Sequence, residues 1–199
     1  MPAHGVISDV TDTLVGVLDD ALSSLFAPPA PQAMVHDLQG TVPTNPPTLA
    51  VFLYEITEDA HSRNRPMQRL PVPGGVQTAL PPMAINLRYL IVPFAGDRAT
   101  EQQMLGRTMQ VLYENAVLSG PLLRGQPAPD GLVGSDAQLS STLDPLSLEE
   151  RTRVWHAVQK PYRLSLSYQI RVVNIDPIAR QSAELARSRS FDPAVPVAE

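Results

Sequence analysis

Histidines and carboxylates are the residues of this chain that could carry acid–base or metal chemistry. The four histidines are spread along the sequence: His4, His36, His61 and His156. No two of them have the four-residue spacing that places two metal ligands on one face of a helix. His61 follows Glu58 and Asp59, a grouping that could form a metal loop but is more simply a solvated polar loop. We therefore expect neither a metal nor a cofactor.

Nucleophiles in a recognisable setting are also missing from the sequence. It contains no cysteine and no GxSxG, SxxK or HExxH motif. Gly74 and Gly75 are too short a glycine run for a phosphate-binding loop and are typical of a turn. We predict that the chain is not an enzyme. A hydrolase or transferase whose carboxylates converge only in three dimensions remains the alternative, because sequence alone does not give their separation.

Arginines are the candidates for binding a partner, since a guanidinium can form forked hydrogen bonds with acidic groups. Arg63, Arg65 and Arg69 lie in a polar stretch over residues 58–80, which we predict to be a long loop with a turn at 73–75. Arg163 and Arg171 lie near the C-terminal end of the periodic sequence. A solubilising charge cluster is the simpler interpretation of the first three. We predict these five as partner contacts.

The clearest structural pattern is the alternation over residues 161–176, which predicts one long strand. Its apolar side is Tyr162, Leu164, Leu166, Tyr168, Ile170 and Val172. Its polar side is Arg163, Ser165, Ser167, Gln169 and Arg171. We expect a sheet packed on one face, with a second face that is wet or covered by another polar surface.

Other periodic segments predict the remaining elements. Apolar residues at three- and four-residue steps predict a helix over 7–26 with Ser8 as its N-cap. The further predictions are strands over 34–38, 48–57, 83–94 and 136–143, a helix from Asp97 or Thr100 to about Leu118 buried through Leu105, Met109, Leu112 and Ala116, and a short helix opened by the capping box of Ser147 and Glu150. This order predicts an α+β fold, a mixed or mostly antiparallel sheet with helices packed on it.

Composition narrows the function further. The net charge of −5 argues against nucleic-acid binding, and no apolar run approaches the roughly 18 residues that span a bilayer. The N-terminus lacks the pattern of a secretory signal, so we expect a cytoplasmic protein; membrane contact stays open. Residues 1–176 are expected to form one domain, and 177–199, with three prolines and little periodicity, a flexible or partner-ordered tail.

Six segments together resemble one protein family. They are VISDVTDTLVGVLDDAL from residue 6, TLAVFLYEITED from 48, the pair Arg63 and Arg65, PMAINLRYLIVPFAGD from 82, EQQMLGRTMQVLYENAVLSG from 101, and LEERTRVWHAVQKPYRLSLSYQIRVVNID from 148. Over about residues 6–176 the chain resembles the N-terminal domain family of the cap, or tail-terminator, protein of phage-tail-like contractile injection systems. These particles are typified by the Photorhabdus virulence cassette and the antifeeding prophage.

The resemblance implies a tail-terminator-like fold and a structural cap. Such a cap would form a ring, with a hexamer expected, on the end of the inner tube distal to the baseplate. Its partners would be copies of itself, the inner tube protein and the sheath protein, in a particle assembled in the cytoplasm that is released or membrane-attached. A phage tail completion or head–tail joining protein is the alternative within the same structural class.

Overall fold

A computed structural model describes residues 4–72, 75–176 and 180–184 of the chain. The chain divides into two compact units, which are described separately. The larger unit consists of Met1–Asn64 and Pro82–Asp176, and the smaller of Arg65–Pro81 and Pro177–Glu199. Asp176, the expected end of the domain, is thus also the last residue of the larger unit.

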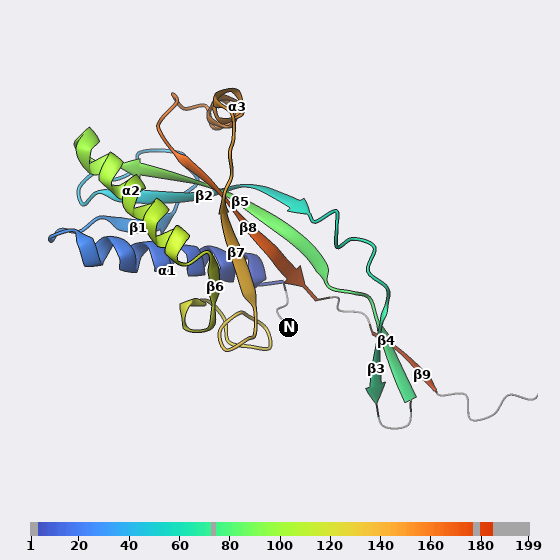
Figure 1. Ribbon diagram of the computed structural model, residues 1–199. Coiled ribbons are helices and arrows are strands. Elements are labelled where there is room, and N and C mark those ends of the chain that lie inside the picture. Colours follow the sequence, from blue (N-terminus) through green and yellow to red (C-terminus); the bar gives the residue numbers. More distant parts are fainter. Residues whose placement is uncertain (1–3, 73–74, 177–179, 185–199) are drawn as a thin grey trace, which may run out of the picture. The chain divides into compact units, whose positions relative to one another are not determined.

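The larger unit is built on a six-stranded sheet (Figure 1). In spatial order its strands are β1 (Gln32–Val35), β2 (Thr48–Glu58), β5 (Met83–Phe94), β8 (Leu166–Ile175), β7 (Gln138–Leu143) and β6 (Val117–Ser119). Only β1 and β2 are parallel; the other four pairs are antiparallel. The α+β prediction with a mixed, mostly antiparallel sheet is therefore confirmed. The predicted strands over 48–57 and 83–94 are β2 and β5, the two longest strands.

Both faces of this sheet carry apolar clusters. On one face α1 (Val6–Leu25) and α2 (Arg98–Glu114) pack over the odd-numbered residues of β5, among them Leu87, Tyr89 and Ile91. On the other face α3 (Leu148–Val158) inserts Trp155 and Val158 against a second cluster. The members of that cluster on the strands and the preceding loop are Leu38, Ala50, Leu90 and Val92. β2 and β5 are therefore covered on both sides where these helices lie.

The helix ends test the capping predictions. The N-cap of α1 is Gly5 and not Ser8, because Ser8 lies inside the first turn and its Oγ donates to Gly5 O at 2.6 Å. Of the two predicted caps of α2, Asp97 and Thr100, the structure has Asp97, which accepts from Thr100 N at 2.8 Å. α2 ends at Glu114 and not near Leu118, because the chain turns there into β6. The predicted capping box of α3 is confirmed in full by Ser147 and Glu150.

The smaller unit contains a three-stranded antiparallel sheet where a loop was predicted. β3 (Gln68–Val72) and β4 (Gly75–Ala79) pair with each other, and β9 (Arg180–Glu184) pairs with β4. The prediction of a loop over 58–80 is therefore wrong. The sequence did not reveal these strands because each is only five residues long and Pro71 lies within one of them. β9 also lies in the segment expected to be a tail. Residues 177–179 and 185–199 of that segment lie outside the described residues.

The long C-terminal strand begins five residues later than predicted. β8 starts at Leu166, opposite Ile91 of β5, so continuing this register would place Leu164 opposite Pro93. Proline has no N–H to donate, and the two segments separate at this point. Tyr162 and Leu164, expected to be buried, are 42% and 51% exposed.

The polar side of this strand was predicted to be wet or covered by another polar surface, and part of it is covered. Ser165 and Ser167 are buried, whereas Arg171 is exposed. Ser165 Oγ accepts the indole N–H of Trp155 at 3.4 Å, so α3 covers this part of the face with a polar partner. Within the described residues, no helix is long and apolar enough to cross a membrane.

Candidate functional site

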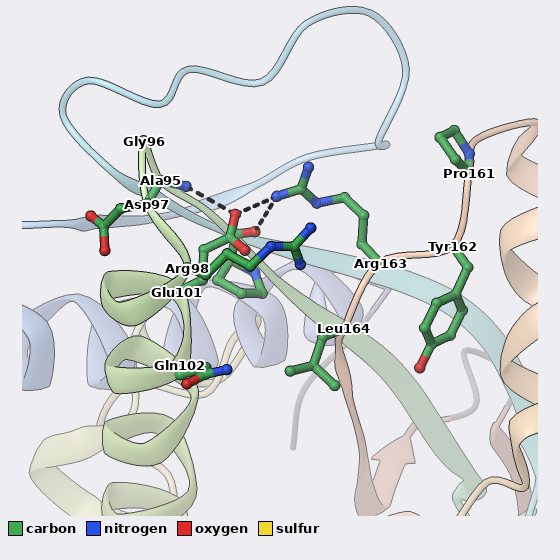
Figure 2. A pocket seen from close by; sticks show the side chains of 11 residues that line it. Ala95, Gly96, Asp97, Arg98, Glu101, Gln102, Pro161, Tyr162, Arg163 and Leu164 are labelled. Atoms are coloured by element: carbon green, nitrogen blue, oxygen red, sulfur yellow. Dashed lines mark hydrogen bonds and ion pairs between the residues drawn. The ribbon is translucent and has the colours of Figure 1, made fainter.

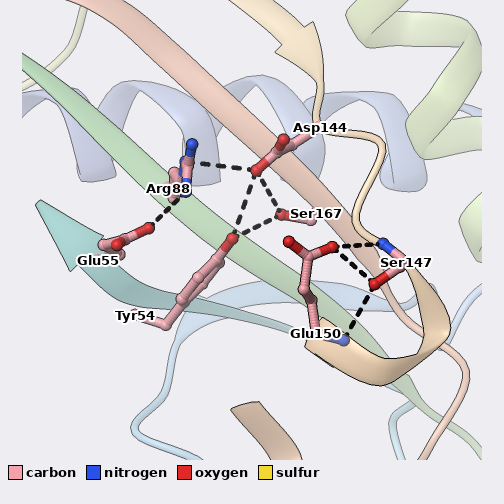
Figure 3. A network of polar contacts seen from close by, with 7 residues as sticks. All are labelled: Tyr54, Glu55, Arg88, Asp144, Ser147, Glu150 and Ser167. Carbon is pink, nitrogen blue, oxygen red and sulfur yellow. Dashed lines mark hydrogen bonds and ion pairs between the residues drawn. The ribbon is translucent and has the colours of Figure 1, made fainter. Parts of the chain in front are cut away.

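A polar network lies on the face of the sheet that carries α3 (Figure 3). Arg88 of β5 donates from Nη1 to Glu55 Oε2 of β2 at 2.7 Å, and its Nε lies 3.4 Å from Asp144 Oδ2. This second contact is an ion pair and not a hydrogen bond, so Arg88 Nε has no hydrogen-bond partner. Tyr54 Oη lies 3.0 Å from Ser167 Oγ and 3.5 Å from Asp144 Oδ2.

An irregularity in β2 brings these groups together. The pairing of β2 with β5 shifts between Leu53 and Glu55, so Tyr54 is the extra residue of a β-bulge. A bulge turns two successive side chains toward one face, which places Tyr54 and Glu55 beside Arg88. Such a register shift has no sequence signal of its own in this strand. Sequence analysis therefore missed the network.

Burial, hydrogen bonds and neighbouring charges shift the pKa values of two members of the network, Tyr54 and Arg88. Burial, opposed by the hydrogen bond with Ser167, raises the pKa of Tyr54. Burial lowers the pKa of Arg88, but the hydrogen bond to Glu55 and the negative charge of Asp144 outweigh it, and the net pKa is raised. Arg88 thus stays a cation between two carboxylates.

The network resembles a nucleophile beside a base but is poorly arranged for catalysis. Ser167 is only 3% exposed, so its hydroxyl has little access to a substrate. Asp144, whose Oδ2 lies 3.5 Å from Ser167 Oγ, faces the guanidinium of Arg88. A serine nucleophile is normally activated by an adjacent general base. The geometry therefore suits a clamp between the two strands and the segment leading to α3.

One pocket lies where β8 separates from β5 (Figure 2). It has a volume of about 510 Å³ and is bounded by the N-terminal half of α2 and by residues 161–164. Arg163 crosses its wall, where the guanidinium pairs with Glu101 of α2 and lies 4.6 Å from the centre of the Phe94 ring. Arg163 also donates to Pro93 O at 3.4 Å. It thus ties the strand segment to α2 and is half-buried.

Another pocket lies at the C-terminal half of α2. It has a volume of about 500 Å³, and apolar side chains supply most of its lining. Met109 and Tyr113 of α2 form one side, and Leu143 of β7 and Tyr168 of β8 form the other. Tyr113 is 86% exposed. Met109, predicted to lie in the buried stripe of α2, is 42% exposed.

The remaining predicted arginines are at the surface. Arg63, in the larger unit, is exposed, and its Nε lies 3.6 Å from Glu58 Oε2. Arg65 and Arg69 are exposed in the smaller unit, the latter on β3. Arg171 lies on β8 opposite Ser140 of β7. Arg163 and Arg171 therefore do not form one exposed face, and their part in binding a partner stays a prediction.

The histidines form no metal site in the part of the chain that the structure describes, where no cluster of three potential ligands occurs. The side chain of His61 is 97% exposed and its Nδ1 lies 3.5 Å from Asp59 Oδ1, which agrees with a solvated loop. The hydrogen bond from Ser62 lowers the pKa of Asp59. His36 accepts the backbone N–H of Leu38 and so serves a local turn.

Comparisons with known proteins give a family and a fold. Residues 9–189 match the model of the Pvc16 N-terminal domain family. No curated protein matches the chain.

Two solved structures share the fold. The chain is similar to a PVC sheath/tube terminator, in its extended state, of an extracellular contractile injection system, with a TM-score of 0.66 and 20% identity over 96% of this chain and 64% of that one. It is also similar to the tube-terminating cap of the anti-feeding prophage, with a TM-score of 0.59 and 20% identity over 94% and 61% of the two chains. The chain thus spans a little under two thirds of the length of either protein.

Proposed function

This chain belongs to the Pvc16 N-terminal domain family, and on that premise we propose that it is a structural cap of a contractile, phage-tail-like injection system. It ends the inner tube and the sheath at the end distal to the baseplate. The observation that carries this proposal is the family match over residues 9–189, supported by a fold shared with a sheath/tube terminator and with a tube-terminating cap.

The capping role calls for a ring, and a hexamer fits a tube built from rings of subunits. A closed ring needs a heterologous interface, in which two different surfaces of each copy meet. The large sheet offers two distinct edges for this purpose, because β1 and β6 are its outermost strands. Copies of this chain, the inner tube protein and the sheath protein are the proposed partners. Nucleic acid is not, given the net charge of −5.

The cap acts by contact and breaks no bond. The polar network suits this role, because Ser167 is buried and Asp144, the carboxylate beside it, is paired with Arg88. Arg63, Arg65 and Arg69 remain the proposed contacts to an acidic partner surface. The particle is assembled in the cytoplasm and is then released or membrane-attached.

Deleting the gene in the producing bacterium tests this function. Without a terminator, tube and sheath growth lose their stop signal, so negative-stain images are expected to show particles of irregular and excessive length. Restoring the gene on a plasmid is expected to restore uniform length. Particles of normal, uniform length in the deletion strain would contradict the proposal.

A further inference from the structure

The two units of the chain carry opposite net charges. The larger unit contains 17 acidic and 10 basic residues, a formal charge of −7, whereas the smaller contains 3 acidic and 5 basic residues, a charge of +2. These two values add up to the −5 of the whole chain. Opposite charges on two surfaces of one protein favour contact between copies, because each surface attracts its counterpart on the next molecule.

The smaller unit buries little of itself. Its sheet consists of three strands of five residues each. Among the side chains of this unit that the structure describes, those of residues 65–69 and 76–81, only Ala79 is buried. A sheet of this size needs an apolar face packed on another surface, and a chain without cysteine has no disulfide to replace that packing. We therefore expect contact with another surface to complete the unit.

Exposed arginines give the smaller unit a positive surface. Arg65 and Arg69 are both exposed, and the described side chains of the unit include no carboxylate. Arg69 lies on β3, an outermost strand of the small sheet, so a partner can reach it from the edge. A guanidinium forms forked hydrogen bonds with a carboxylate, so an acidic surface is the partner that fits.

The larger unit gathers its negative charge on the side formed by α1 and residues 120–137. These two segments contain six aspartates and one arginine, a net charge of −5. Hydrogen bonds fasten the second segment to the helix. Asp9 accepts the backbone N–H of Leu132 at 3.0 Å, and Thr13 Oγ1 accepts that of Arg124 at 2.8 Å. One side thus carries most of the negative excess of the larger unit.

Three of these aspartates are exposed, and no ion pair links them to a cation within the described residues. They are Asp12, Asp130 and Asp136, and we call the surface that carries them the α1 acidic surface. By contrast, Asp20 pairs with Arg124, and elsewhere in the larger unit Glu101 pairs with Arg163. The α1 acidic surface therefore lacks the counter-charges that neutralise other carboxylates of this unit.

We infer, on the premise of the proposed function, that the smaller unit of one copy binds the α1 acidic surface of the next copy in the ring. The contact is heterologous, because two different surfaces of the chain meet, and repeating it closes a ring. A second copy is the occupant because this chain itself supplies both of the surfaces with complementary charge. Arg65 and Arg69 of one copy then pair with the exposed aspartates of its neighbour.

Two charge-reversed chains test this contact in the deletion strain. The first carries Arg65→Glu and Arg69→Glu, the second carries Asp12→Arg and Asp130→Arg, and particle lengths are measured in negative-stain images. Each chain alone is expected to give the irregular, excessive lengths of the deletion strain, because like charges then meet at every contact. Producing both chains together is expected to restore uniform length, because a ring with an even number of copies can alternate them and bring opposite charges together.

Two controls separate this contact from effects of net charge and of folding. A chain with Arg98→Glu and Arg153→Glu reverses two exposed arginines of the larger unit, so its net charge changes as much as that of the first variant. It is expected to give particles of wild-type length. Urea unfolding followed by the fluorescence of Trp155 is expected to give the wild-type midpoint for every variant, because the replaced side chains are all exposed.

A chain with all four substitutions of the two variants shows whether the contact joins two copies. If this chain restores uniform length and the two variants produced together do not, the contact lies within one chain and the inference is wrong. Uniform length with either variant alone, or irregular length with the control, would also overturn it. Each of these results leaves the proposed function standing, provided that the wild-type gene restores uniform length. A wild-type gene without effect on length would contradict the proposed function itself.

Discussion

Replacing Asp9 by alanine should destabilise the fold far more than its place near the start of α1 suggests. Asp9 is only 1% exposed, and its two carboxylate oxygens accept the backbone N–H groups of Gln126 and Leu132 at 3.1 and 3.0 Å. These bonds fasten the loop after α2 and β6 to the first helix. Without the carboxylate, two donors that are buried or partly buried lose their acceptor.

The expected loss follows from those two donors. Each buried N–H left without an acceptor costs about 1–3 kcal/mol. Since Gln126 is only partly buried and water can reach it, we expect a total near 3 kcal/mol. With a urea dependence of about 2 kcal/mol per molar, the unfolding midpoint should fall by about 1.5 M. This is a large share of the 5–15 kcal/mol that typically stabilises a domain.

Urea unfolding followed by tryptophan fluorescence measures this loss. Trp155 is the single tryptophan and is buried on the opposite face of the sheet, so its signal reports unfolding of the whole larger unit. Asp12→Ala is the matched control, because Asp12 is exposed on the same helix. Asp9→Asn should show most of the loss expected for Asp9→Ala, since an amide offers one acceptor oxygen in place of two. Equal midpoints for Asp9→Ala and Asp12→Ala would refute the reasoning.

Two further substitutions and one pH dependence follow from the same structure. Gly125 has φ +104°, and a Cβ there would overlap the carboxyl group of Asp9, so Gly125→Ala should cost more than 2 kcal/mol in urea unfolding. Gly134→Ala, with φ +77° and open space around it, should cost only about 1 kcal/mol, and equal losses would contradict this contrast. Hydrogen bonds from Ser147 hold the pKa of Glu150 below its ordinary value of 4.5. The stability that Glu150 contributes is therefore present above pH 4.5 and lost as the pH falls through the lowered pKa. The stability difference between the wild type and Glu150→Gln should shrink on acidification, and a difference that grows below pH 4.5 would have the wrong sign.

Sequence patterns predicted the elements whose pattern is local. The amphipathic first helix, the strands that became β2 and β5, and the Ser147–Glu150 capping box all depend on residues close together in the chain. The small sheet was missed because β3 and β4 are only five residues long each and Pro71 lies within β3. Its third strand, β9, lies about a hundred residues further along the chain, so its pairing left no local signal.

The candidate site was less predictable because it depends on long-range contacts. The bulge at Tyr54 and its proximity to Ser167 arise from strand pairing between distant segments. Arg163 was predicted to contact a partner because of its place on a polar strand face. The strand begins only after it, and its guanidinium instead pairs with Glu101 and lies over the Phe94 ring. Tyr162 and Leu164 fit the alternating pattern of a buried strand face, but both are exposed in the structure.

Cryo-electron microscopy of the particle end distal to the baseplate tests the central claim most directly. If the chain is a cap, density for the six-stranded sheet flanked by α1, α2 and α3 should form a closed ring on the last tube subunits. A tube end without this chain, or with the chain found elsewhere on the particle, would contradict the account.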